Sequence, residues 1–375
     1  MSVTGATAGG AQEETRGEAQ EGAARVAERL AGHQRRFDAV FAEYFDTLSQ
    51  QPLPRGAFVP DALGLVRDMS LRGGKRLRVA LLHEAARLVT PDPVAGLDEA
   101  AISIELLQTH LLIHDDIIDD SATRRGAPSV YYAYRDRFAD DPWTALGLAV
   151  LAGDLAAFLS MRALLTAPLP AQLRQAMTAV QSEAGADTVM GQFLDLERDF
   201  GPVPDLDALD TVADYKSARY SLLAPLKLGL LAAGEDPTAH AGELARYARL
   251  VGVSGQMRDD HLDLFGDADL LGKPAGADLR SGRRSYAVCA VLAATSGAEK
   301  DLVESALAER GCTQETVAHV RGIAERLGVD EELRARTRQI AEQASEVAAG
   351  WRGRWRQEAV DFFAHLPLWG TRRTG

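Results

Sequence analysis

Two short acidic runs with the same spacing are the part of this sequence best suited to chemistry. They are DDIID at residues 115–119 and DDHLD at residues 259–263. On a helix, the first and last aspartates of such a run are four positions apart, so their carboxylates project from one face. Mg²⁺ usually takes one or two protein carboxylates and completes its shell with waters and substrate phosphates. The two runs together therefore suggest a site for a metal-diphosphate group.

The segments that carry the runs predict helices with a polar stripe. Residues 101–118 are apolar around most of the helical circumference, which is typical of a helix surrounded by other helices. Gln108 lies two turns before Asp115 on the same face, and Gln256 precedes the second run. A third stripe consists of Gln192, Asp195 and Asp199. Buried carboxylates without partners are costly, so cations are expected close to them.

Basic residues that suit a phosphate recur near both runs. Lys75 and Arg78 lie one turn apart where a helix is expected to begin, and free amides at such an end favour phosphate. Two neighbouring arginines follow the first run, and each guanidinium can bind a diphosphate through two hydrogen bonds. The two arginines are Arg124 and Arg125. Lys216, next to Ser217, and Lys273, next to Pro274, add point charges.

Composition sets the class of protein. The 375 residues are 46% hydrophobic and 25% charged, as in an ordinary globular protein. The net charge of −13 argues against a nucleic-acid partner, which would attract clustered Lys and Arg. Cys289 and Cys312 offer no disulfide framework, so a cytoplasmic location is expected. We also expect no integral membrane segment, because no uninterrupted apolar stretch looks long enough to span a bilayer.

Helical periodicity runs through most of the chain, and the breaks fall at Pro, Gly and Asp clusters. We expect an all-α, single-domain bundle over residues 26–375, preceded by a disordered tail at 1–25, which has almost no large apolar residues. The helices are expected near 26–49, 61–70, 75–90, 97–120, 143–166, 171–199, 206–217, 219–233, 239–265, 285–296, 300–310, 313–327 and 329–364.

The order of these segments resembles the trans-isoprenyl diphosphate synthases, or polyprenyl synthetases, and among them the short-chain geranylgeranyl and farnesyl diphosphate synthases. The resemblance covers about residues 40 to 290 and includes GGKRLR, ELLQTHLLIHDDIIDDSATRRGAP, GQFLDLE, YKSARYSLLAP and GQMRDDHLDLFGDADLLGKPAGADLRSGRRSY. It implies a helical bundle around a deep central cavity, Mg²⁺ as cofactor and a homodimer. It also implies head-to-tail condensation of isopentenyl diphosphate with an allylic diphosphate, in which ionisation of the allylic diphosphate comes first.

The resemblance also assigns roles to single residues. The positions that match isopentenyl diphosphate binding are Lys75, Arg78, Gln108 and Arg125. Those that match the surroundings of the allylic diphosphate are Arg124, Lys216, Ser217, Gln256 and Lys273, together with Arg283 in place of a usual lysine. The principal metal ligands match Asp115, Asp119 and Asp259, supported by Asp116, Asp260 and Asp263. The residues expected to take part in catalysis are Asp115, Asp119, Asp259, Lys216, Ser217 and Gln256.

Several positions depart from the commonest pattern of the family. Gln108 stands where many bacterial members have histidine, Ser217 where threonine is usual, and Gly255 where phenylalanine is usual. His110 and Leu111 occupy the positions that set product length in many relatives. Both are of middle size, and the first run lacks the two-residue insertion typical of bacterial farnesyl synthases. We therefore expect geranylgeranyl diphosphate, ahead of farnesyl diphosphate or longer products.

Two other functions stay open on the sequence. A class I terpene cyclase shares the DDxxD run but normally has a different second metal motif. A non-catalytic partner subunit of another synthase would be expected to have degraded aspartate runs, and both runs are intact here.

Overall fold

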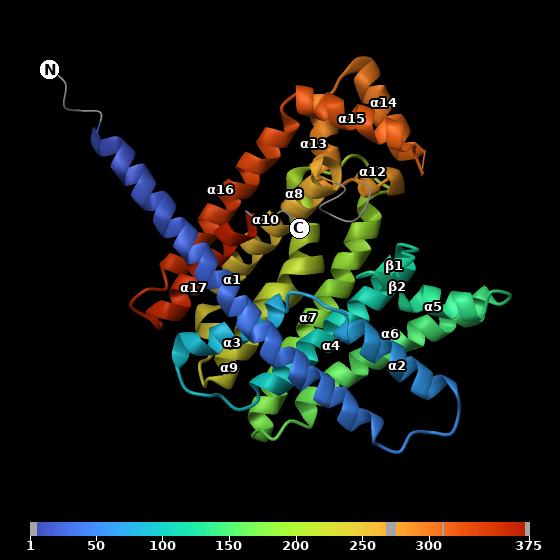
Figure 1. The fold of residues 1–375 in the computed structure, drawn as a ribbon, viewed down its shortest axis with the longest axis vertical. Coiled ribbons are helices and arrows are strands. Elements are labelled where there is room, and N and C mark those ends of the chain that lie inside the picture. The colour runs from blue at the N-terminus through green and yellow to red at the C-terminus, as the bar shows by residue number, and fades with distance from the viewer. Residues whose placement is uncertain (1–5, 268–274, 310, 372–375) are drawn as a thin grey trace. The chain divides into compact units, whose positions relative to one another are not determined.

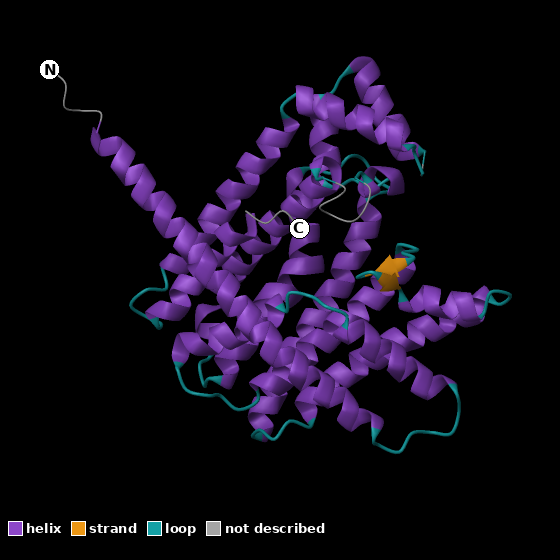
Figure 2. Ribbon diagram, viewed as in Figure 1, coloured by secondary structure: helices purple, strands orange, loops and turns teal. Residues whose placement is uncertain are grey.

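The computed structural model describes residues 6–267, 275–309 and 311–371, and side chains from Gln20 onward. Helices make up most of this part of the chain (Figures 1 and 2), so the all-α prediction is confirmed. The chain forms two compact units. Unit 1 consists of Met1–Ala27, Ala186–Leu223 and His240–Gly375, and unit 2 consists of Glu28–Gly185 and Ala224–Ala239. The expectation of one domain over residues 26–375 stays a prediction.

Unit 2 is built around two long helices, α4 and α6, which pack against each other. Alanines on the inner face of α6, among them Ala145, Ala149 and Ala152, are fully buried and let the two backbones approach. Phe37 and Phe41 close this core from α1. The elements of this unit are the second part of α1 (Ala6–Ser49), α2 (Phe58–Leu71), α3 (Leu77–Val89), α4 (Leu97–Ile118), α5 (Val130–Arg137), α6 (Pro142–Leu165), the first part of α7 (Ala171–Arg198), α9 (Ala224–Ala232), and the antiparallel strands β1 (Thr123–Arg124) and β2 (Ala127–Pro128). The short helix η2 (Pro237–His240) ends at the boundary with unit 1.

Unit 1 is built around α10, which contacts α16, α13 and the π-helix η1. Trp351 is fully buried, and its ring centroid lies 5.0 Å from that of Tyr247 and 5.6 Å from that of Phe363. This aromatic group holds the C-terminal helices on α10. The elements are the second part of α7, α8 (Leu206–Ala213), η1 (Asp214–Leu223), α10 (Ala241–Phe265), α12 (Ala277–Ser281), α13 (Tyr286–Ala294), α14 (Gly297–Ala308), α15 (Gln314–Arg326), α16 (Val329–Ala349) and α17 (Gln357–Thr371).

Several element boundaries differ from those expected. Helix α1 begins at Ala6 rather than near residue 26, because Ala, Glu and Gln are good helix formers even without apolar periodicity. The helix expected at 329–364 is two helices, separated by a turn in which Gly353 has a φ of 82°. The break expected after residue 217 is absent, because η1 continues α8 into α9. The helices α5 and α12 and the hairpin were not expected.

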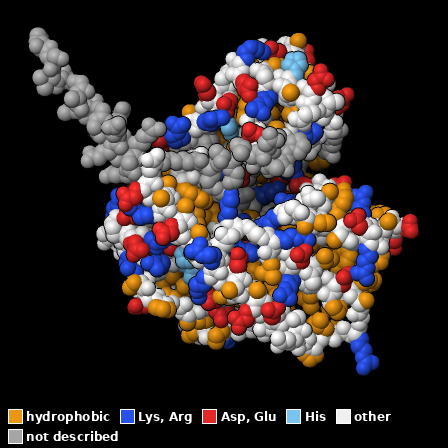
Figure 3. Space-filling view, in the orientation of Figure 1, with side chains coloured by type: hydrophobic (Ala, Val, Ile, Leu, Met, Phe, Trp, Pro, Cys, Tyr) orange, Lys and Arg blue, Asp and Glu red, His pale blue; other side chains and the backbone are white. Residues whose placement is uncertain are grey.

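Helix α6 bears on the expectation of no membrane segment, which stays a prediction. By length and composition alone it could cross a bilayer, which the sequence analysis did not foresee. Its apolar character has a simpler explanation, because α4 and α5 pack against it and bury its alanine face. On the face drawn in Figure 3, acidic and basic side chains are interspersed, with hydrophobic side chains between them.

The buried imidazole of His83 on α3 makes unit 2 sensitive to acid. Its ring stacks on that of His33 at 5.2 Å, and Arg36 Nη1 lies 3.4 Å from its Nε2. Burial, followed by the charges of His33 and Arg36, lowers the pKa of His83 from 6.5 to about 3. In the unfolded chain this histidine takes up a proton below its ordinary pKa, whereas in the folded chain it stays neutral. The stabilisation is therefore complete above pH 6.5 and is lost as the pH falls toward 3.

We expect the free energy of unfolding to fall by roughly 2 kcal/mol between about pH 7 and pH 5 because of His83. Urea titrations at both pH values measure this loss. His83→Gln should lose less stability than the wild type over the same interval, and His319→Gln, at an exposed position on α15, should behave as the wild type. Equal losses in His83→Gln and the wild type would contradict the assignment.

Candidate active site

The first acidic run lies at the end of α4 in unit 2. The helix ends at Ile118, and the backbone N–H of Asp119 donates to Asp115 O at 2.9 Å. Asp115 is half-buried, whereas Asp116 is 1% exposed. Arg124 Nε donates to Asp116 Oδ1 at 2.8 Å, and Arg124 Nη2 lies 3.5 Å from Asp115 Oδ2. One guanidinium thus contacts two carboxylates of the run.

Burial and the contact with Arg124 act on the pKa of Asp116 in opposite directions. Burial raises the pKa of Asp116, and the hydrogen bond from Arg124 opposes that rise. Because its side chain is buried against Arg124, the structure gives Asp116 a role in fixing the arginine. Asp115 and Asp119 are the more accessible carboxylates of the run. Their oxygens are the hard ligands that Mg²⁺ prefers.

A tight hairpin positions the two arginines. β1 pairs with β2 in the register Arg124 to Ala127, and the turn residues Arg125 and Gly126 have φ values of 52° and 76°. Positive φ at both turn positions is the type I′ geometry that suits a two-residue hairpin. Consecutive arginines at this point therefore project from the strand and from the turn.

The hairpin brings Arg125 to the basic segment before α3. Arg125 Nη1 donates to the carbonyl oxygens of Arg72 and Gly73 at 2.9 and 3.0 Å. A side chain at Gly74 would lie 3.2 Å from the Arg125 guanidinium, so the glycine allows this approach. Burial lowers the pKa of Arg125, and nearby positive groups, Arg78 among them, lower it further. Such a concentration of positive charge suits an anion.

The other residues expected in this half of the site lie on α3 and α4. Lys75 is exposed and precedes the first residue of α3, so it lies before the helix rather than within it. Gln108 is buried on α4, two turns before Asp115. His110 and Leu111 are half-buried on the same helix, and His110 Nδ1 lies 3.0 Å from Gly153 O on α6.

The second acidic run lies on α10 in unit 1. Its aspartates have different surroundings. The side chain of Asp259 is 69% exposed and lies 3.1 Å from Arg258 Nη1. Asp260 is buried and accepts hydrogen bonds from Gln256 Nε2 at 2.7 Å and from the backbone N–H of Tyr286 at 2.8 Å. Asp263 is also buried, and its Oδ2 accepts from the backbone N–H of Asp278 at 2.9 Å.

These surroundings give the buried and the exposed aspartates of the second run different roles. Burial, followed by the charge of Asp278, raises the pKa of Asp260. Asp260 and Asp263 therefore hold α10 against α12 and α13, whereas Asp259 presents its carboxylate to solvent. Of the three, Asp259 is the one best placed to bind a metal ion.

Unit 1 also contains a cavity of about 60 Å³ beside this run. It brings together six residues that the sequence singled out: Asp195, Lys216, Ser217, Gln256, Asp260 and Arg283. Residues of other segments complete the wall, and the sequence analysis assigned none of them to the site. They include Arg198, Asp278, Ser285 and Tyr286. Arg198 could have been suspected, because it lies next to Asp199 of the third stripe. No sequence pattern indicates the other three, which only the folded chain brings to the cavity.

The π-helix η1 positions Lys216 and Ser217. Gly191 of α7 lies against η1 so closely that a Cβ at this position would be 2.2 Å from Lys216 N. Lys216 Nζ donates to Asp195 Oδ2 at 2.6 Å, and Arg198 Nη1 lies 2.8 Å from Asp195 Oδ1. Burial alone would raise the pKa of Asp195, but the charges of Lys216 and Arg198 outweigh burial and lower it. The wider turn of a π-helix is frequent at functional sites.

The expected residue Lys273 lies outside the described residues. Every other residue of the expected site is described. Lys75, Arg78, Gln108, Asp115, Asp116, Asp119, Arg124 and Arg125 belong to unit 2, and Lys216, Ser217, Gln256, Asp259, Asp263 and Arg283 belong to unit 1.

Comparison with known proteins assigns the chain to a family. The sequence profile named Polyprenyl synthetase matches residues 62–324. The chain belongs to the polyprenyl synthetase family. As a polyprenyl synthetase it is a prenyltransferase of the short-chain farnesyl and geranylgeranyl type, as the resemblance implied.

Two curated relatives and one solved structure illustrate the likeness. The chain is 31% identical to farnesyl diphosphate synthase of Escherichia coli over 244 residues, 63% of this chain and 77% of the relative. It is 33% identical to geranylgeranyl diphosphate synthase of Methanosarcina mazei over 256 residues, 68% of this chain and 72% of the relative. The fold resembles that of geranylgeranyl pyrophosphate synthase from Corynebacterium glutamicum, solved with isoprenyl diphosphate and magnesium. That likeness has a TM-score of 0.77 at 27% identity and covers 94% of this chain and 99% of the other.

Proposed function

We propose that this polyprenyl synthetase makes geranylgeranyl diphosphate by condensing isopentenyl diphosphate with allylic diphosphates. The observation that carries the proposal is that both acidic runs are intact and each has basic groups beside it. Asp115 lies 3.5 Å from Arg124, and Lys216 and Gln256 line the cavity beside the second run. A cyclase does not need the second basic set of Lys75, Arg78 and Arg125, which would seat isopentenyl diphosphate.

The donor set fits Mg²⁺. Asp115 and Asp119 present carboxylates at the end of α4, and Asp259 presents a solvent-exposed carboxylate on α10. We propose that all three act on the same allylic diphosphate. When bound, Mg²⁺ supplies positive charge that stabilises the departing diphosphate. Arg124 beside the first run and Lys216 beside the second add positive charge that neutralises a leaving diphosphate further.

The protein's part in the reaction is electrostatic. The C–O bond of the allylic diphosphate breaks, and the bonding electrons leave with the diphosphate. The alkene of isopentenyl diphosphate, bound by Lys75, Arg78, Gln108 and Arg125, then attacks the allylic cation and forms the new C–C bond. Loss of a proton from the condensed cation completes the product, and the released diphosphate can accept that proton. The amide of Gln256 and the hydroxyl of Ser217 face the cation with dipoles rather than with a strong nucleophile.

One assay tests this proposal against its rivals. Purified protein is incubated with Mg²⁺, labelled isopentenyl diphosphate and dimethylallyl, geranyl or farnesyl diphosphate, and the products are separated by chromatography. We expect geranylgeranyl diphosphate, with no product when Mg²⁺ is chelated. A cyclised hydrocarbon formed without isopentenyl diphosphate would favour the cyclase. Turnover only after addition of a second synthase chain would favour a partner subunit.

Product length is proposed to depend on His110. His110 lies five positions before Asp115 on α4. Its imidazole is half-buried, and its Nδ1 lies 3.0 Å from Gly153 O. His110→Ala removes the ring and should shift the main product to chains longer than twenty carbons, measured by chromatography of the dephosphorylated products. His319→Ala, at an exposed position on α15, is the control and should leave product length unchanged. An unchanged product in His110→Ala would show that another residue sets the limit, and farnesyl diphosphate from the wild type would refute the proposed product.

We propose further that the enzyme is a homodimer and that α6 forms part of its interface. Four large apolar side chains on α6 are exposed and lie seven or eight positions apart, so they share one face. They are Trp143, Leu151, Phe158 and Leu165, with exposed fractions of 80, 63, 76 and 55%. A stripe of this kind is typical of a face that another chain covers.

Replacing one of these side chains by a charge tests the dimer. Phe158→Glu should convert the dimer into a monomer in sedimentation experiments, because an unpaired carboxylate in an apolar interface is costly. Val203→Glu, in the exposed loop after α7, is the matched control and should stay dimeric. A wild-type monomer, or a dimeric Phe158→Glu, would contradict this interface.

The cytoplasmic location and the absence of a nucleic-acid partner stay predictions.

A further inference from the structure

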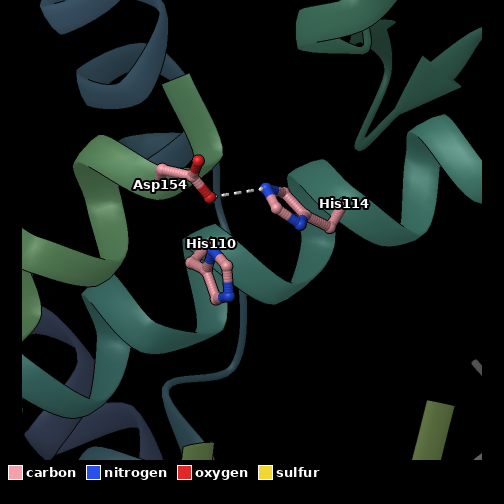
Figure 4. A group of neighbouring side chains, drawn as sticks. All are labelled: His110, His114 and Asp154. Atoms are coloured by element: carbon pink, nitrogen blue, oxygen red, sulfur yellow. Dashed lines mark ion pairs between the residues drawn. The ribbon is translucent and has the colours of Figure 1, made fainter. Parts of the chain in front are cut away.

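Three side chains with metal-ligating atoms lie together in unit 2, two of them on α4 just before the first acidic run. His110 and His114 lie four positions apart on α4, and Asp154 lies on α6. One ligand atom from each of the three lies within 4.8 Å of the others. Figure 4 shows the Asp154 carboxylate pointing from its helix toward the ring of His114.

The packing of α4 on α6 fixes this arrangement. Gly153 has no side chain, and a Cβ there would lie 2.2 Å from His114 Cδ2, so any other residue would displace the imidazole. His110 Nδ1 lies 3.0 Å from Gly153 O. A histidine that binds a metal usually donates the N–H of its other ring nitrogen to a carboxylate or a backbone carbonyl. That hydrogen bond fixes the orientation of the ring. The ring centroids of His110 and His114 are 4.5 Å apart.

The separation of two of the ligand atoms fits a tetrahedral ion. His114 Nε2 and Asp154 Oδ1 are 3.4 Å apart. Two ligands at about 2.0–2.1 Å from a tetrahedral Zn²⁺ are separated by about 3.3 Å.

The ligand types select against Mg²⁺. Mg²⁺ takes oxygen ligands and keeps several waters, whereas imidazole suits Zn²⁺, Co²⁺ and related ions. Two histidines and one carboxylate leave a fourth position open for water, as in many zinc sites with three protein ligands. We propose that His110, His114 and Asp154 bind one divalent cation of the Zn²⁺ or Co²⁺ type, separate from the Mg²⁺ used in the reaction. The bound ion links α4 to α6.

Titration with Co²⁺ tests the site directly, because visible absorption reports its coordination number. Full-length protein without a histidine tag is titrated in excess Mg²⁺, which occupies the carboxylate sites. We expect one equivalent of Co²⁺ to bind with the intense visible bands of a four-coordinate ion. Near-isosteric variants, His110→Gln, His114→Gln and Asp154→Asn, should each weaken binding by at least about tenfold. His319→Gln, which removes an exposed imidazole on α15, should bind as the wild type does.

X-ray absorption of the wild-type Co²⁺ complex supplies a measurement that does not depend on how the variants fold. Two imidazole ligands and oxygen in the remaining positions would support the site. Absence of Mg²⁺-resistant binding, an all-oxygen shell, or unchanged affinity in the variants would overturn it. None of these readouts uses prenyl transfer, so the metal site and the proposed reaction can fail separately.

Discussion

Asp115→Asn is expected to lower kcat for prenyl transfer by at least about 10²-fold, the size of effect seen when a group that stabilises transition-state charge is removed. The substitution keeps the shape of the side chain but removes the negative charge that binds Mg²⁺. Asp115 is half-buried and lies 3.5 Å from Arg124, so the same change also leaves that guanidinium with one carboxylate fewer. Steady-state kinetics at saturating Mg²⁺ and substrates measure the loss.

Asp120→Asn is the matched control for this experiment. Asp120 follows the first run directly, its side chain is 68% exposed, and its φ of 48° is a conformation that asparagine adopts readily. The same change of charge one residue beyond the run should leave kcat within about twofold of the wild type. Equal losses in both variants would show that general electrostatics, rather than a metal ligand, explains the effect. A kcat close to that of the wild type in Asp115→Asn would remove Asp115 from the mechanism.

Arg76→Met is expected to lower the free energy of unfolding by about 3–5 kcal/mol, because it leaves buried carboxylate charge without its partner. Arg76 is 4% exposed. Its Nη1 donates to Glu105 Oε2 at 2.7 Å, its Nε donates to Asp38 Oδ1 at 2.8 Å, and its guanidinium lies over the rings of two phenylalanines. Denaturant titration followed by circular dichroism measures the change.

A surface arginine provides the comparison for Arg76. Arg67 Nη2 pairs with Asp46 Oδ1 at 2.6 Å, but the two side chains are 42% and 57% exposed. Exposed ion pairs contribute little, so Arg67→Met should cost less than about 1 kcal/mol. A small loss in Arg76→Met would contradict the structural role given to this residue.

The case of Arg76 shows where prediction from sequence stops. The segment Gly73–Arg78 was recognisable as a phosphate-binding motif, and Lys75 and Arg78 were assigned to it from their spacing. The arginine between them had no signal of its own. Its role depends on Glu105 and Asp38, which lie 29 and 38 positions away in the sequence. Only the folded chain brings these three side chains together.

Helices followed from the sequence because their signal is local. Apolar residues at helical spacing predicted α4, α6 and α10 close to their observed bounds, and the fold class followed. The two-stranded hairpin at 123–128 and the π-helix η1 were missed because they have no such local signal. A turn with positive φ at Arg125 and a wider helical turn at Lys216 are stabilised by tertiary contacts, such as the bonds from Arg125 to Arg72 and Gly73.

The acidic runs show a similar limit within the site. Their spacing predicted a shared face for each run, but it could not distinguish the aspartates by burial. Asp116 is buried against Arg124, and Asp260 is buried against Gln256 and Tyr286. The contacts of Asp116 with Arg124 and of Asp260 with Tyr286 join residues 8 and 26 positions apart, which a spacing rule does not contain.

A crystal structure of the enzyme with Mg²⁺ and an allylic diphosphate analogue that cannot ionise is the most direct test of the central proposal. We expect carboxylates of both acidic runs, Asp115 and Asp119 from α4 and Asp259 from α10, to bind Mg²⁺ ions on the oxygens of one diphosphate. Metal ions at only one run, or a diphosphate bound without contact to either run, would contradict the account.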